Sequence, residues 1–144
     1  MSGYKDLEIY VQSHDLAVRV HDMTKRLPAF EDYEEASQVR RSSKRISAGI
    51  VEGYALRKYR DEFLHFLYRS LASSDETAEH LQFLWETKSL KDKKTFTDLI
   101  EGYVVLSKRI GAFIMGVERH HTTPAYLPAS KIKNPKSKIV QEVP

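Results

Sequence analysis

The stretch RRSSKRISAGIVEGYALRKYRDEFLHFL, residues 40–67, spans the end of one amphipathic segment, a short link and the start of the next. At about 100° per residue, a narrow sector of about 80° collects small and apolar residues. They are Ala36, Val39, Ser43, Ile46 and Ile50. This stripe predicts a helix that packs along one side and ends near Gly53, a residue type common at helix C-termini. The short link GYALRK makes the two neighbouring helices antiparallel.

The same helical periodicity continues in both directions along the chain. We expect helices from about Asp6 to Leu27, from Asp32 to near Gly53, from about Tyr59 to Lys88, and from Asp92 or Thr95 to Val117. Asp32 is the expected N-cap of the second helix, with Glu35 placed for a capping box. The sequence thus predicts an all-α, antiparallel up-down-up-down four-helix bundle over residues 1–121. Residues 122–144, rich in proline and lysine, are expected to form a disordered or extended basic tail.

Composition limits the class of protein. The 144 residues suit one domain, and 41% hydrophobic with 30% charged residues is typical of a globular chain. Without cysteine, neither a disulfide framework nor a thiolate metal site can form. No apolar run reaches the roughly 20 residues of a membrane span, and the N-terminus lacks a signal-peptide pattern. We therefore expect a cytoplasmic protein that does not enter a membrane.

Four cations lie on the helix half opposite the apolar stripe: Arg40, Arg41, Lys44 and Arg45. Three more follow in and after the link: Arg57, Lys58 and Arg60. Charged faces are common on surface helices, so composition alone favours a solvated face balanced by acids such as Glu76 and Glu79 on the next helix. The absence of acidic partners four residues away on the same helix favours an external anion instead. Both interpretations remain open from the residues alone.

Catalytic and metal chemistry find little support in the sequence. There is no cysteine nucleophile, no Gly-x-Ser-x-Gly elbow and no phosphate-binding glycine loop, so we expect a protein that is not an enzyme and needs no cofactor. Glu62 with His65, and Glu118 with His121, have the Glu-x-x-His spacing of dimetal bundles. Glu62 and His65 point away from the apolar stripe, so these ligands would not converge and no metal site is expected. His14 and His21, on an apolar stripe, are expected to be packed and hydrogen-bonded.

Three segments also carry a family pattern. They are LEIYVQSHDLAVRVHDMTKRLP, SQVRRSSKRISAGIVEGY and DEFLHFLYRSLASSDETAEHL. Their order resembles the 23S rRNA intervening-sequence protein family, also called S23, over most of residues 4–90. One departure is Gly49-Ile50-Val51, where many members have Asn-Ile-Ala.

The resemblance implies a cytoplasmic bacterial four-helix bundle that assembles as a ring, expected to be a homopentamer. The family is similar to the accessory variability proteins of diversity-generating retroelements, which are basic pentameric barrels that bind nucleic acid and a reverse transcriptase. Surplus apolar residues, such as Phe83, Val104, Val105 and Met115, also favour an oligomer. Nucleic acid, with RNA favoured over DNA, is therefore the expected partner of the seven cations. The alternative is an adaptor that binds an acidic protein, such as a reverse transcriptase-like enzyme.

Overall fold

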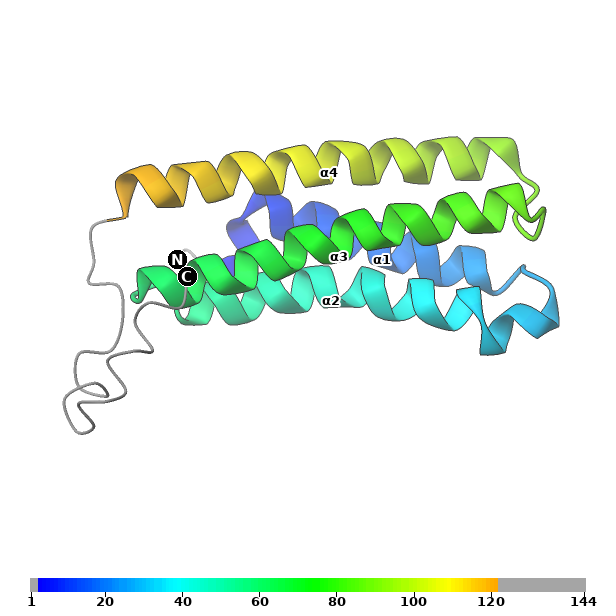
Figure 1. The fold of residues 1–144 in the computed structure, drawn as a ribbon, viewed down its shortest axis with the longest axis horizontal. Helices are drawn as coiled ribbons and strands as arrows, with labels where there is room; N and C mark the ends of the chain where they lie inside the picture. The colour runs from blue at the N-terminus through cyan, green and yellow to red at the C-terminus, as the bar shows by residue number, and fades with distance from the viewer. Residues whose placement is uncertain (1–2, 122–144) are drawn as a thin grey trace.

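A computed structural model describes residues 3–121 of the chain. Within this range the structure contains four α-helices and no strand: α1 Glu8–Thr24, α2 Glu35–Ala55, α3 Arg60–Glu86 and α4 Lys93–His120. Two short 3-10 helices, η1 Tyr4–Asp6 and η2 Ala29–Tyr33, precede α1 and α2. Figure 1 shows consecutive helices running in opposite directions, with the α1–α2 and α3–α4 links at one end. The prediction of an all-α helical bundle is confirmed, and the predicted tail lies outside the described residues.

The predicted apolar stripe of α2 forms the centre of the core. Its five residues, Ala36, Val39, Ser43, Ile46 and Ile50, are all fully buried. The neighbouring helices contribute buried side chains at helical spacing, such as Val20 on α1, Leu67 on α3 and Tyr103 on α4. Burying one face of each helix removes apolar surface from water, which is the main force that holds such a bundle together. The opposite face of α2 is thereby turned outward.

Helices α2 and α3 approach closely because small residues line the seam between them. A methyl group on Gly49 would lie 2.3 Å from Ser70 Oγ, and one on Gly53 would lie 3.0 Å from Phe66 Cβ. Ser42 Oγ and Thr77 Oγ1 share a buried hydrogen bond of 2.8 Å across the same seam. Helix α2 ends two residues after Gly53, close to the predicted position, but Gly53 is not the residue that ends it. The helix continues to Ala55, and Gly53 is a packing residue inside it.

The start of α2 also differs from the prediction. Glu34, not Asp32, occupies the N-cap position, and Asp32 lies within η2. The carboxylate of Glu31, only 3% exposed, accepts a hydrogen bond from the backbone N–H of Glu35 at 3.1 Å. Its second oxygen accepts a hydrogen bond from Ser89 in the α3–α4 link. A buried carboxylate thus supplies the capping bond from one turn earlier, because η2 folds Glu31 inward.

The start of α4 agrees with one of the two predicted positions. Asp92 is the N-cap residue, and its side chain accepts hydrogen bonds from the backbone N–H groups of Lys94 and Thr95. None of the helices in the described range has the length and apolar character that crossing a membrane requires.

Candidate nucleic-acid interface

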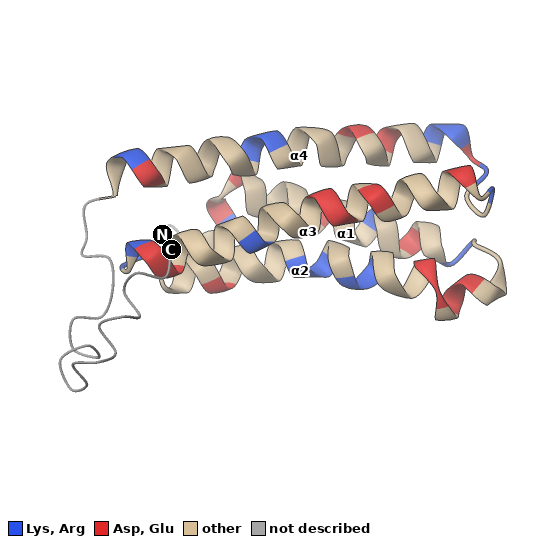
Figure 2. Cartoon of the chain, in the orientation of Figure 1, with Lys and Arg blue, Asp and Glu red and all other residues tan. Residues whose placement is uncertain are grey.

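The outer face of α2 carries two exposed cations side by side, Arg41 and Lys44. Figure 2 shows the basic residues as blue bands along the middle of α2, with acidic residues around η2 at its N-terminal end. Neither side chain makes a hydrogen bond or an ion pair within residues 3–121. The third cation, Arg40, is partly buried, and its Nη1 donates to Thr24 Oγ1 on α1 at 3.0 Å. Arg40 therefore ties α2 to α1, whereas Arg41 and Lys44 face solvent.

The fourth cation, Arg45, is paired across the α2–α3 seam. Its Nη2 donates to Glu76 Oε1 at 3.0 Å, and both side chains are nearly half exposed. The other oxygen of Glu76 lies 3.1 Å from His80 Nε2, and His80 Nδ1 lies 2.7 Å from Glu35 Oε1 on α2. Partial burial alone would raise the pKa of Glu76, but the His80 hydrogen bond and the Arg45 charge outweigh it and lower that pKa. Of the acids named as possible partners, Glu76 thus pairs with Arg45, whereas Arg41 and Lys44 have no acidic partner within residues 3–121.

A groove between α1 and α2 adjoins the exposed cations. It has a volume of about 370 Å³, and its lining residues are His14, Ala17, Val18, His21, Asp22, Lys44 and Ser47. His14 is exposed, so it is not packed as predicted, but the predicted hydrogen bond is present, with His14 Nδ1 3.4 Å from the Tyr10 hydroxyl. The groove is lined by two imidazoles, one ammonium and the carboxylate of Asp22. The sequence analysis placed both histidines on one apolar stripe of this helix, and the structure places both in this groove.

The remaining predicted cations lie at the far end of α2. About 21 Å of helix, at 1.5 Å per residue, separates Arg41 from the last residue of α2. The Arg57 guanidinium lies 4.0 Å above the Tyr54 ring, and Lys58 Nζ lies 5.7 Å from the Tyr59 ring centre. Arg60 donates to the backbone carbonyl of Glu118 at 3.1 Å. The structure thus places the seven predicted residues in two separate groups.

The Glu-x-x-His pairs have other partners. Glu118 Oε2 accepts a hydrogen bond from the Tyr68 hydroxyl at 2.8 Å, and that bond raises the pKa of Tyr68. His65 packs edge-on against Phe66, with 5.5 Å between the ring centres. His121 Nε2 lies 2.6 Å from the carbonyl oxygen of Arg57. Across the described residues, no cluster of three or more histidine, aspartate or glutamate side chains has a metal-binding arrangement.

Comparison with known families gives a match over residues 5–112, from η1 into α4, to the 23S rRNA-intervening sequence proteins. The chain belongs to this family. The match extends beyond residue 90, farther than the motifs recognised in the sequence, and it contains all seven predicted cations. Comparison with curated proteins gives no match.

A solved structure supports the same fold for this 23S rRNA-intervening sequence protein. It is a protein of unknown function from the S23 ribosomal protein family of Bacteroides thetaiotaomicron. The two superpose with a TM-score of 0.67 at 22% identity, over 74% of this chain and 95% of the other. At this identity, the likeness shows a shared fold and carries no functional assignment.

Proposed function

We propose that this protein is a non-enzymatic, oligomeric, cytoplasmic helical bundle that binds nucleic acid, with RNA favoured over DNA, through the outer face of α2. The observation that carries the proposal is the pair Arg41 and Lys44, exposed, adjacent and without an acidic partner in residues 3–121. A cation left without a partner in the folded chain is available to neutralise a phosphate. The family name, which refers to 23S rRNA, adds weight to RNA as the ligand.

The other five cations have secondary roles in this proposal. Arg45 can leave Glu76 for a phosphate at small cost, because an exposed ion pair contributes only about 0.2–1 kcal/mol. Arg40 holds the α1–α2 contact and supports the face. Arg57, Lys58 and Arg60 would contact the backbone of a longer ligand at the far end of the helix. Repetition of the patch around an oligomer would join modest contacts into one high-avidity surface.

Assembly is supported by exposed apolar side chains on three helices. They are Val11 and Val18 on α1, Phe83 on α3, and Val104, Val105 and Met115 on α4, each 40–53% exposed. Apolar residues at such positions gain free energy when a second copy covers them. A homopentamer is the proposed state.

The test is RNA binding measured by fluorescence anisotropy at several salt concentrations. We compare the wild type with Arg41→Gln/Lys44→Gln and with the matched control Lys5→Gln/Lys108→Gln, which makes the same change in net charge. Loss of two phosphate contacts should lower the slope of log affinity against log salt by about 1.4–1.8. The control should retain the wild-type slope. Equal binding by both variants, or no binding by the wild type at low salt, would show that the proposal is wrong.

A second candidate function is an adaptor for an acidic protein. Val18, 49% exposed, lines the same groove as Lys44, so the groove offers an apolar contact next to a cation. Such a mixed surface suits a protein segment as well as a phosphate chain. Capture of an acidic protein partner that depends on Val18, together with no salt-dependent RNA binding, would favour the adaptor.

A further inference from the structure

The α3–α4 link, residues 87–92, places two lysines at the end of the bundle. Lys88 has φ 68°, the only positive φ of a non-glycine residue in the described range. This left-handed residue turns the chain out of α3, and the backbone N–H of Leu90 then donates to the carbonyl of Leu84 at 2.9 Å. Leu90 is buried and anchors the link, while Lys88 and Lys91 on either side of it are exposed.

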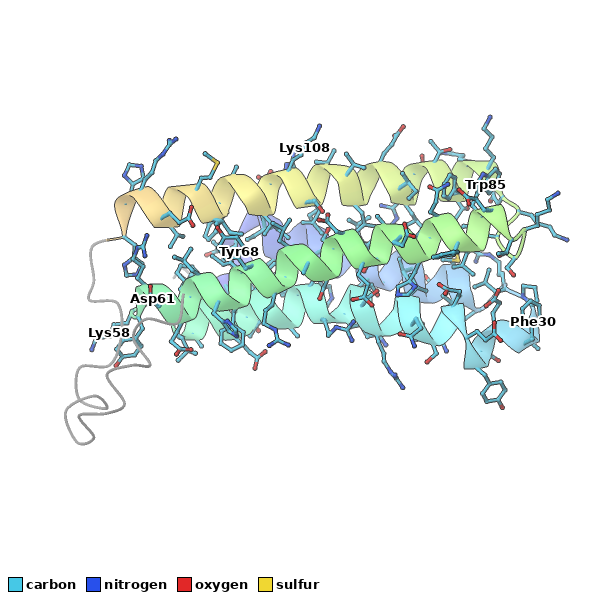
Figure 3. The ribbon with its side chains drawn as sticks, in the orientation of Figure 1. Phe30, Lys58, Asp61, Tyr68, Trp85 and Lys108 are labelled. Atoms are coloured by element: carbon cyan, nitrogen blue, oxygen red, sulfur yellow. The ribbon has the colours of Figure 1, made fainter. Side chains whose placement is uncertain are left out.

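Trp85 forms one wall of a groove at this link. The indole stacks on Phe96 of α4, with 4.8 Å between ring centres and 9° between ring planes. The ring also lines a groove of about 460 Å³ together with Glu86, Lys88, Leu90 and Lys91. Figure 3 shows Trp85 beside the α3–α4 link, far from Lys58 at the other end of the molecule. The stacking on Phe96 holds the indole in place before any ligand arrives.

In the described part of the chain, the acidic side chains around this groove have hydrogen-bond partners, and the lysine side chains do not. The side chains of Lys88 and Lys91 make no hydrogen bond or ion pair within residues 3–121, whereas the nearby acids accept hydrogen bonds. Glu86 Oε2 accepts a hydrogen bond from Gln82 Nε2 at 2.8 Å. Asp92 is occupied as the N-cap of α4. Lys91 also lines a second groove, of about 510 Å³, whose wall includes Arg26. A ligand along the link would therefore meet an aromatic ring and then cations on both sides.

We propose that this groove binds single-stranded nucleic acid, with an unpaired base stacked against Trp85 and the adjoining phosphates on Lys88 and Lys91. An aromatic platform flanked by cations is the arrangement by which proteins bind single strands without reading their sequence. A duplex keeps its bases stacked internally and cannot offer one to the indole. The inference rests on the proposed function, since it assumes nucleic acid as the ligand, but it concerns a site distinct from the face of α2.

Trp85 is the only tryptophan of the chain, so intrinsic fluorescence reports on this groove directly. We would titrate the full-length protein with a single-stranded oligonucleotide of about eight nucleotides, and with its duplex, while recording tryptophan emission. The single strand should quench the emission and the duplex should not. The variant Lys88→Gly/Lys91→Gln should lower the slope of log affinity against log salt for the single strand by about 1.4. Lys108→Gln serves as the control, because Lys108 projects from α4 away from the link (Figure 3).

The glycine at position 88 keeps the variant folded, since glycine adopts a positive φ without strain and the link geometry is preserved. A weaker affinity therefore reports a lost contact and not a collapsed link. If oligonucleotide binds by anisotropy and depends on Arg41 and Lys44, yet leaves the tryptophan emission unchanged, the groove proposal is overturned while the proposed function stands. If no oligonucleotide binds at low salt by either signal, both are overturned.

Discussion

The carboxylate of Glu76 is shared between Arg45 on α2 and His80 on its own helix, at 3.0 and 3.1 Å. It therefore competes with any external phosphate for the Arg45 guanidinium. The Glu76→Gln variant should bind RNA more tightly at low salt, because Arg45 loses its internal anion and the face of α2 loses one negative charge. Anisotropy titration measures the change. Glu79→Gln, an exposed glutamate one turn away, removes the same charge without freeing a cation, and an equal gain there would contradict the argument.

The same carboxylate predicts a pH dependence of stability. Its pKa is lower in the folded protein than the ordinary value of 4.5, so the deprotonated form stabilises the fold. This contribution is present above pH 4.5 and is lost as the pH falls through the folded pKa. It should stay below about 1 kcal/mol, because the side chains of Glu76 and Arg45 are both nearly half exposed to solvent. Urea unfolding should show Glu76→Gln less stable than the wild type at neutral pH, with the difference vanishing in acid.

At the scale of the residue, the sequence identified the cations and candidate acids but did not decide which cation each acid meets. Four of the seven were identified from helical spacing and three from their place in and after the link, and glutamates on the next helix were named as possible partners. Which cation each acid meets depends on how α2 and α3 are rotated about their axes, and the periodicity of one helix does not determine this. Hence Arg45 has an acidic partner and Lys44 has none among residues 3–121, although they are neighbours in the chain.

At the scale of the element, the α2–α3 seam depends on Gly49. An alanine methyl group there would meet Ser70 Oγ, which donates to the carbonyl of Ile46 at 2.9 Å. Gly49→Ala should therefore displace that hydroxyl and destabilise the fold by about 1–3 kcal/mol. In a Ser70→Ala background the obstacle is absent, and the same substitution should be neutral or stabilising by up to about 1 kcal/mol.

Urea unfolding of the four proteins in this double-mutant cycle gives the coupling energy, expected to exceed about 1 kcal/mol. Gly111→Ala is the control, because a methyl group there meets nothing within 4 Å and should stabilise α4 by its higher helix propensity. A coupling energy near zero between positions 49 and 70 would contradict the argument, because it would mean that α2 and α3 accommodate the methyl group without loss of stability.

The glycines also show where element prediction fails. Helix existence and the buried face of α2 followed from periodicity, and each helix was found near its predicted range. Gly53 was interpreted as a helix end because glycine is common there, but close packing of two helices requires glycine for a different reason. The contact of Gly53 with Phe66 on α3 shows that Gly53 serves helix packing and not helix termination. That contact involves a different helix, so the local sequence does not reveal it.

At the scale of the molecule, the exposed apolar side chains predict assembly in solution. Light scattering coupled to size exclusion should give five times the 16.7 kDa of one chain. Val104→Glu/Val105→Glu should lower that mass, because two charges would be buried at the contact without partners. Ala48→Glu, at an exposed position of α2, a helix that carries none of these exposed apolar side chains, is the control. A wild-type mass of 16.7 kDa would rule out the assembly.

The buried hydrogen bond between Glu31 and Ser89 has a consequence for the folding pathway. It joins the α1–α2 link to the α3–α4 link across 58 residues, so it can form only after both helical hairpins have docked. We expect this docking to follow the rate-limiting step of folding, and contacts made after that step slow unfolding without speeding folding. Removal of the hydroxyl by Ser89→Ala should therefore raise the unfolding rate and leave the refolding rate nearly unchanged. Through this bond, the end of the bundle that carries Trp85 should contribute to the lifetime of the native protein.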